Sequence, residues 1–167
     1  MGPDLPRPRK QLDFRAAAEA LTAPGAESAT MASIARRLEV AKPTLYRMAG
    51  SREELVQLCV DAEAERLLEQ LHRAGGIAGF LAFVEDSPAG FTLLFGGRHP
   101  QARQAVRRVE NRLRDDMHRR GVPQAQSVAA GLLGLAASVA RRALEDGVPL
   151  ESLDLQGILG RVAPEGN

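Results

Sequence analysis

The side chains best suited to chemistry in this chain lie close together in one segment. They donate hydrogen bonds or carry positive charge, and they are Lys42, Thr44, Tyr46, Arg47 and Arg52. Donors of this kind bind phosphate oxygens and the acceptor-bearing edges of DNA bases. In a short helix over residues 42–47 only Leu45 is available for a core, so the polar groups face solvent or a partner. This layout is typical of a helix that reads DNA.

The neighbouring residues predict the elements that hold this segment. Apolar residues at helical spacing indicate a preceding two-turn helix with Thr30 as its N-cap, and they are Met31, Ile34, Ala35 and Leu38. Pro43 is compatible only with the first turn of the second helix. Gly50 permits a left-handed turn, and Ser51 with Glu54 forms a capping box that begins a third helix. Two short helices on a tight turn, followed by a capped helix, predict a helix-turn-helix.

Arg52 stands out because it places a cation in the first turn of that third helix. The helix dipole favours anions there, and the neighbouring Glu53 and Glu54 follow this preference. A cation in such a position predicts an anionic partner, and a DNA phosphate is the obvious one.

The combined pattern covers roughly residues 12–58. It consists of Thr30, Ile34-Ala35, Val40, Thr44-Leu45-Tyr46 and Gly50-Ser51-Arg52-Glu53-Glu54-Leu55. This set resembles the DNA-binding domain of TetR-family transcriptional regulators. The resemblance implies that Lys42 and Pro43 approach bases, and that Thr30, Tyr46 and Arg52 contact phosphates. Arg47 could pair with guanine or with phosphate, and Tyr46 could instead pack against a helix.

The sequence departs from the family pattern at three places. Met48-Ala49 stands where many members have His-Phe, which removes a phosphate contact and a core ring. Glu39 stands where the turn usually has glycine, and a left-handed conformation there costs about 1 kcal/mol. Ala26 follows Gly25 where an aromatic residue is common. These changes bear on DNA affinity and on the operator more than on the fold.

Charge is distributed unevenly along the chain. Residues 1–52 contain nine Lys/Arg and five Asp/Glu, a net charge of +4, and the remainder has a net charge of −3, which together give +1. A basic end is what nucleic-acid binding requires. Residues 1–10 are proline-rich and basic, so we expect an arm that is solvated or reaches DNA through Arg7, Arg9 and Lys10.

The spacing of apolar residues predicts an all-α fold. We expect the arm at 1–10, an N-terminal three-helix helix-turn-helix domain at 11–56, and a C-terminal helical effector and dimerisation domain at 57–167. Further helices are predicted over residues 52–73, 77–84, 88–95, 101–120 and 124–145, with a last one after Pro149. The longest apolar run, 128–139, is too short to cross a bilayer, and the chain has a single cysteine and no apolar leader. We therefore expect a cytoplasmic protein without a membrane partner.

The predicted helix over residues 124–145 is apolar on nearly all sides, so it must be covered on more than one face. In TetR-like proteins the last two long helices form a four-helix bundle with a second subunit, and this chain is similar. The resemblance thus implies a homodimer. Its interface residues are Leu132, Leu135, Val139, Leu155, Ile158 and Leu159.

A regulatory small molecule would bind in an apolar pocket of the C-terminal domain. The candidate lining residues are Phe83, Phe91, Phe95, Leu113 and Met117, with His118 as a polar group. The alternative is that these residues form an ordinary core, as apolar stripes at helical spacing usually do. Cys59 likewise fits a core thiol better than a redox sensor.

Nothing in the sequence points to catalysis. The histidines are scattered and match no metal spacing, and no nucleophile or phosphate-loop motif occurs, so we expect no metal, no cofactor and no enzyme activity. The sequence predicts a regulator, by family habit a repressor, that binds a palindromic double-stranded DNA operator as a homodimer and is released by a small apolar effector. The alternative is an all-helical interaction protein that keeps the helix-turn-helix as a scaffold, and the departure at Met48-Ala49 keeps it open.

Overall fold

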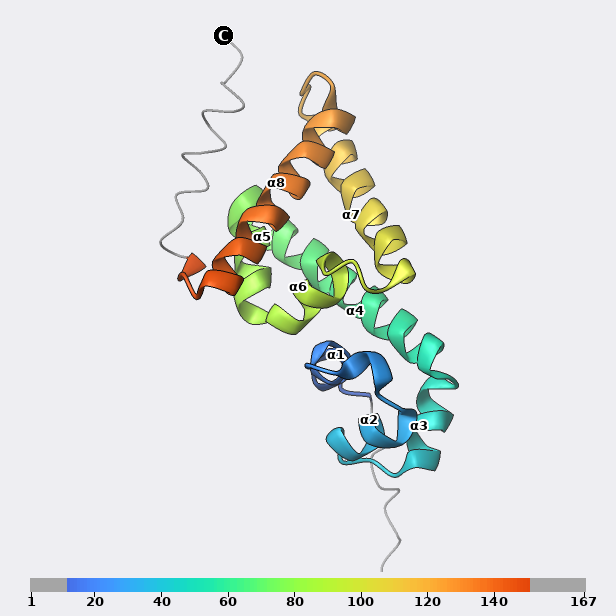
Figure 1. Ribbon diagram of the computed structural model, residues 1–167. Coiled ribbons are helices and arrows are strands. Elements are labelled where there is room, and N and C mark those ends of the chain that lie inside the picture. The colour runs from blue at the N-terminus through green and yellow to red at the C-terminus, as the bar shows by residue number, and fades with distance from the viewer. Residues whose placement is uncertain (1–11, 151–167) are drawn as a thin grey trace, which may run out of the picture.

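The computed structural model describes residues 12–150, apart from the side chain of Glu27, and this part of the chain contains helices and no strands (Figure 1). The elements are α1 (Phe14–Thr22), the 3₁₀ helix η1 (Ala26–Ser28), α2 (Met31–Arg37), α3 (Lys42–Ala49), α4 (Arg52–Ala74), α5 (Gly76–Asp86), α6 (Pro88–Phe95), α7 (Pro100–Arg119) and α8 (Ala125–Asp146). The predicted all-α fold is confirmed. The arm at 1–10, the last predicted helix and its interface residues Leu155, Ile158 and Leu159 lie outside the described residues.

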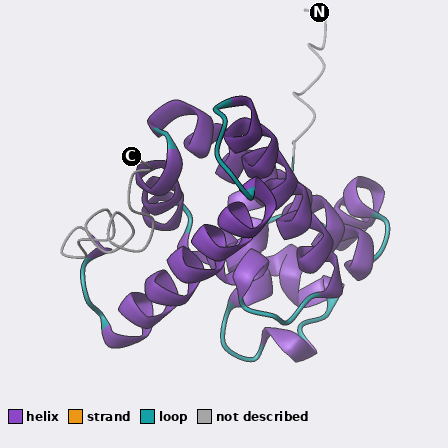
Figure 2. Ribbon diagram, turned by 90° about the horizontal axis from the view of Figure 1, so that it is seen from above, coloured by secondary structure: helices purple, strands orange, loops and turns teal. Residues whose placement is uncertain are grey.

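The long helix α4 connects the two ends of the molecule. At one end α1, α2 and α3 gather around its first half, and at the other end α7 and α8 form an antiparallel pair (Figure 1). Along its length α4 packs against α5 and α7, while α1 packs against both α4 and α6. Figure 2, seen from above, shows how short the loops between these helices are. The helix-turn-helix is therefore attached to the rest of the chain through α1 as well as α4.

One continuous buried cluster runs through the described residues. It includes Leu21, Ile34 and Leu45 at the helix-turn-helix end and extends through α4 to Phe83 and Ala140. The predicted boundary between residues 56 and 57 falls inside α4. The two predicted domains thus share a core, because apolar side chains of α4 contribute to both.

The inward face of α4 does not include all of its apolar residues. Leu55 and Cys59 are buried, whereas Leu58 is 38% exposed. The buried face also includes Val56, Val60, Glu63 and Leu67, which follow one another at helical spacing. The apolar residues of α4 exceed what one face can hold, so spacing alone did not determine which of them face inward.

Among the described residues, α8 is the one helix that has the length and composition to cross a membrane. The core helix of a soluble protein passes the same test. In this structure α8 packs on α7 and α5, and its last turns carry the exposed residues Arg141, Arg142 and Glu145. These features indicate a helix that packs on its own protein along one face and is uncovered along the other.

Candidate nucleic-acid interface

The helix α3 is held to the molecule by two small apolar contacts. Leu45 and Ala49 are its buried residues, and Pro43 occupies the first turn, as predicted. The helix extends two residues beyond the predicted 42–47 because Ala49 also reaches the core. The remaining side chains point outward. Lys42, Pro43, Tyr46 and Arg47 are exposed and Thr44 is half-buried.

Lys42 and Tyr46 lie side by side on this outer face. The Nζ atom of Lys42 is 5.8 Å from the centroid of the Tyr46 ring, within the range of a cation–π contact. The Tyr46 ring is 44% exposed, which makes it a surface group rather than part of the core. The two side chains thus present an ammonium and a phenol hydroxyl together.

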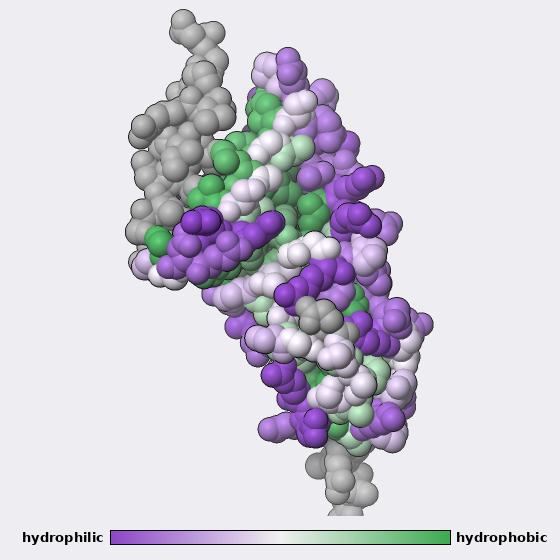
Figure 3. All heavy atoms as spheres, viewed as in Figure 1, coloured by the Kyte–Doolittle hydropathy of each residue, from purple (hydrophilic) through white to green (hydrophobic). Residues whose placement is uncertain are grey.

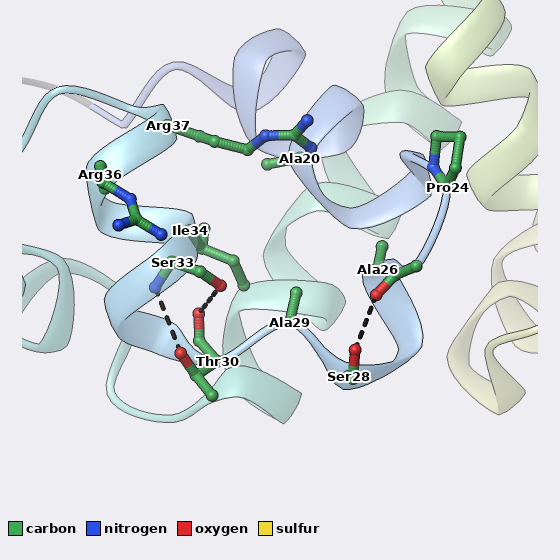
Figure 4. Close-up of a pocket in the computed structure, with 11 residues that line it drawn as sticks. Ala20, Pro24, Ala26, Ser28, Ala29, Thr30, Ser33, Ile34, Arg36 and Arg37 are labelled. Carbon is green, nitrogen blue, oxygen red and sulfur yellow. Dashed lines mark hydrogen bonds between the residues drawn. The ribbon is translucent and has the colours of Figure 1, made fainter.

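Local hydrogen bonds close both ends of α2, the second of which is the turn into α3. Thr30 caps α2 as predicted, with its hydroxyl oxygen accepting from the Ser33 N–H at 3.2 Å (Figure 4). Glu39 adopts φ +52°, the left-handed conformation expected at this turn. The N–H of Val40 then donates to the Ala35 carbonyl at 3.0 Å. The cap fixes the exposed Thr30 at the start of α2, and the bond of Val40 fixes the turn from α2 into α3.

The transition from α3 to α4 depends on Gly50. Its φ is +67°, and a Cβ there would collide with the Glu54 carboxylate. That carboxylate accepts from the Ser51 N–H at 2.7 Å, while the Ser51 hydroxyl accepts from the Glu54 N–H at 3.1 Å. The predicted capping box is confirmed, and it fixes the direction in which α4 leaves α3.

Arg52 has partners that the sequence did not reveal. Its Nε donates to the carbonyl of Ala29 and its Nη2 to the carbonyl of Ala26, both at 3.1 Å. These carbonyls supply the negative partial charge that the cation at the start of α4 needs. The positive charge of Arg52 at the start of α4 therefore does not need a phosphate as its partner. The phosphate contact of Arg52 stays a prediction.

An open hollow of about 510 Å³ lies beside the helix-turn-helix, between α1, η1 and α2. It is lined on the α2 side by Thr30, Ser33, Arg36 and Arg37, and Arg37 extends across it toward Ala20 (Figure 4). Sequence reasoning did not single out these two arginines, although their adjacency was a usable signal. They add positive charge to the outer side of α2.

The predicted effector residues are only partly brought together. Phe91 and Phe95 stack with centroids 5.3 Å apart, and Phe80, which the sequence analysis did not select, meets both rings edge-on at 6.2 and 5.8 Å. Phe83 is fully buried, and Leu113 and Met117 are partly buried on α7. His118 is instead exposed, in an open hollow of about 900 Å³ at the α7–α8 turn. None of the other five predicted residues lines that hollow.

A buried carboxylate lies between α4 and the α5–α6 junction. Glu63 is fully buried, and neither of its carboxylate oxygens has a hydrogen-bond partner in the described part of the chain. Burial raises the pKa of Glu63, although the Ser87 hydroxyl and Arg66, 3.9 Å away, oppose the shift. A Cβ at Gly90 would collide with this carboxylate, so glycine is what lets α6 approach. No motif in the sequence marked Glu63 as buried.

Next to Glu63, an ion pair joins the helix-turn-helix to the rest of the chain. Arg15 of α1 lies 2.6 Å from Asp86 at the end of α5, and Arg66 of α4 lies 3.7 Å from the same carboxylate. Hydrogen bonding to Arg15 holds the pKa of Asp86 below its usual value. The α1 helix is thus tied to the α5–α6 junction by charge as well as by apolar packing.

The predicted dimer residues on α8 form a half-buried edge. Leu132, Leu135 and Val139 follow helical spacing, and each keeps part of its side chain uncovered. Hydrophobic residues gather along α8, beside the hydrophilic outer face of α7 (Figure 3). Next to this edge Gly131 and Gly134 are exposed, with open space where a Cβ would lie. The surface of α8 is accordingly apolar and shallow.

Similarity to known proteins agrees with this geometry. Residues 14–59 match the family described as bacterial regulatory proteins, tetR family. A crystal structure of a TetR-like transcriptional regulator from Rhodococcus sp. RHA1 is similar over 91% of this chain and 90% of that chain, with a TM-score of 0.69 and 26% sequence identity. No curated protein matches the chain.

Proposed function

This chain belongs to the TetR family of DNA-binding transcriptional regulators, and from that premise we propose that it is a repressor that binds a palindromic operator as a homodimer and leaves it when a small apolar effector binds. The observation that carries the proposal is the outer face of α3, where basic and hydroxyl groups are exposed and only Leu45 and Ala49 are buried. A helix kept only for packing has no need of such a face.

In the proposed complex α3 lies in the major groove of DNA. Lys42 and Pro43 at its start approach base edges, while Thr44 and Arg47 lie on the same exposed helix. Tyr46 and Thr30 contact phosphates, which fix the register of the protein without reading sequence. Thr30 is suited to this role because it is exposed and caps α2 at the edge of the turn.

The proposed dimer is formed through α8. A helix whose edge residues Leu132, Leu135 and Val139 remain half-uncovered gains stability when a second copy covers them, at about 25 cal/mol per Å² of apolar area removed from water. Two-fold symmetry would place the two α3 helices in successive major grooves, roughly 34–36 Å apart. A palindromic operator follows from that symmetry.

The proposed effector site is the aromatic cluster of α5 and α6, with Leu113 and Met117 of α7. An apolar molecule inserted between Phe80 of α5 and the Phe91–Phe95 pair would move α6, and α6 packs against α1 of the helix-turn-helix. An effector acts only through the difference in its affinity for two states, so it must bind the DNA-free arrangement more tightly.

As a DNA-binding regulator the protein would work in the cytoplasm, with no enzyme activity, metal or cofactor.

The test is fluorescence anisotropy of the full chain with labelled DNA from the region beside its own gene, titrated with salt. We expect tight binding whose log affinity falls steeply with log salt concentration, and much weaker binding to a scrambled duplex. Equal and weak binding to both duplexes, and to a wider pool of genomic fragments, would favour the all-helical interaction protein instead.

A further inference from the structure

The guanidinium of Arg52 bridges two segments that are distant in sequence. It lies in the first turn of α4 and bonds to the carbonyls of Ala26 and Ala29, at either end of η1. Thr30, which caps α2, follows directly after Ala29. The loop that leads into α2 is thus fastened to the start of α4.

From this geometry we propose that Arg52 is a positioning residue for DNA binding, which holds the segment 26–30 in place and acts on DNA through Thr30 and α2 rather than through a phosphate contact of its own. The inference rests on the proposed function and goes beyond it, because the family resemblance predicts a direct contact for this residue.

The hydrogen bonds occupy one of the two edges through which an arginine binds a phosphate. Nε and Nη2 form the side edge of the planar guanidinium, which binds oxyanions through two parallel bonds, as the end edge of Nη1 and Nη2 also does. Both atoms donate to backbone carbonyls 23 and 26 residues away in sequence, and both bonds are partly shielded from solvent. A side-on bidentate phosphate contact would require these bonds to break, and an end-on contact would have to form while the side chain stays fastened to Ala26 and Ala29.

The electrostatic surroundings agree with an inward orientation. Burial lowers the pKa of His99, in the loop before α7, and the charges of Arg52 and Arg98 lower it further. The Arg52 guanidinium therefore lies close enough to this half-buried imidazole to influence it.

A direct contact and a positioning role predict different responses to charge-preserving substitution. A lysine keeps the positive charge but cannot reproduce the two-pronged geometry of arginine. Removing a phosphate contact lowers the slope of log affinity against log salt by about 0.9, because one fewer counterion is released. Misplacing Thr30, which is uncharged, weakens binding without changing that slope.

The experiment compares Arg52→Lys and Arg52→Gln with the unmodified full chain. Binding to the DNA beside its own gene is measured by anisotropy across a salt series, and folding is checked by circular dichroism. We expect both variants to lose affinity by about tenfold or more, with an unchanged salt slope, because hydrogen bonds to a charged group are lost in both. Lysine retaining full affinity, while glutamine loses it with a lower slope, would overturn the proposal in favour of a phosphate contact.

A second measurement needs no DNA. Amide hydrogen exchange of residues 26–34 in the free protein should be faster in both variants than in the unmodified chain, and unchanged exchange would overturn the positioning role. Arg47→Gln serves as the matched control, because Arg47 is an exposed arginine of the same motif and its loss should leave exchange in this segment unaltered. If the unmodified chain binds no DNA, the proposed function fails, whereas the exchange data still decide whether Arg52 holds the segment.

Discussion

Helices α3 and α8 each leave one face uncovered, and the two faces have opposite chemistry. The exposed residues of α3 include Lys42, Tyr46 and Arg47, whereas α8 has an edge of half-covered Leu and Val side chains next to exposed glycines. A polar cationic face suits a polyanion, and a shallow apolar edge suits another apolar helix. From this contrast we expect the two faces to bind different partners.

The two helices also differ in how firmly they are held. The eight residues of α3 include two buried ones, but the 22 residues of α8 include seven, of which six are alanine. Alanine lets α7 and α5 pack closely on α8, while α3 depends on the turns before and after it for its position. Substitutions on the outside of α3 should therefore alter binding with little effect on stability.

The largest effect is expected from Lys42→Ala combined with Tyr46→Ala. Each contact contributes roughly 1–3 kcal/mol to DNA binding, so the double variant should bind operator DNA at least about 30-fold more weakly. Because both side chains are exposed, the melting temperature should change little. Arg103→Ala with Gln104→Ala, on the exposed face of α7, is the matched control and should bind normally. A large fall in melting temperature without a change in DNA binding would contradict the role of α3.

The apolar edge is tested by Leu132→Glu combined with Leu135→Glu. Two carboxylates on this edge should prevent association, and sedimentation velocity should show a monomer in place of the proposed dimer. Affinity for a two-half-site operator should then fall by about tenfold or more, since each half-site is bound alone. Gln104→Glu with Asn111→Glu adds the same charge to the exposed face of α7 and should leave the assembly intact. A dimer that survives the α8 substitutions would locate the interface elsewhere.

A substitution at Glu63, which belongs to neither the α3 face nor the α8 face, should change the stability of the protein without changing its binding. Glu63 has a pKa raised by burial, so the folded state holds its proton more tightly than the unfolded chain does. Stability of the unmodified protein should therefore fall as pH rises from the ordinary carboxyl pKa of about 4.3 through the raised value, and Glu63→Gln should remove that fall. Thermal melts from pH 4 to pH 8 would show a gain for the variant that grows with pH.

Asp86→Asn is a control, because its effect on stability should change with pH in the opposite direction. The pKa of Asp86 is lowered by Arg15, so its contribution to stability is present at neutral pH and is lost as pH falls from the ordinary carboxyl pKa through the lowered value. The variant should thus be less stable than the unmodified protein at pH 8, with the difference shrinking toward acid pH. If both variants followed one trend with pH, the assignment of the two carboxylates would be wrong.

The smallest effects concern the turns that lead into the two helices. Glu39 before α3 and Gln124 before α8 share φ +52°, a conformation that costs a residue with a side chain about 1 kcal/mol relative to glycine. Glu39→Gly and Gln124→Gly should each raise the melting temperature by roughly 2–4 °C. Glu39→Gln and Gln124→Glu change the charge while keeping the Cβ, so they separate backbone strain from electrostatics. A glycine variant that melts no higher than its control would show that the side chain compensates the strain.

Sequence reasoning succeeded where the determining signal is local. The cap at Thr30, the box of Ser51 and Glu54, and the turn at Gly50 involve residues within four positions of one another, so their pattern is visible in the chain. Helix ends marked by proline or glycine were likewise predicted to within two residues. These signals describe the frame of the candidate interface, and contacts with DNA stay a prediction.

Features that depend on long-range packing could not be predicted. The partners of Arg52 are backbone carbonyls more than twenty residues away, and a carbonyl carries no sequence signature. Glu63 is buried because Gly90 lets α6 approach it, which requires knowing that α4 and α6 are neighbours. His118 was predicted as the polar group of the apolar pocket, but its side chain is exposed at the α7–α8 turn, which spacing along the chain did not reveal.

The burial of Cys59 makes this protein ready for site-directed labelling. It is the only cysteine in the chain, it lies fully buried in α4, and burial raises its pKa to about 12. Because the thiolate is the reactive species, maleimide or methanethiosulfonate reagents should leave it unmodified at neutral pH. A cysteine introduced at the exposed Ala32 would thus carry the sole spin label or fluorophore. In an assembly of two copies, the separation between the labels on α2 would report how far apart the two helix-turn-helix motifs lie. The native thiol would not have to be removed.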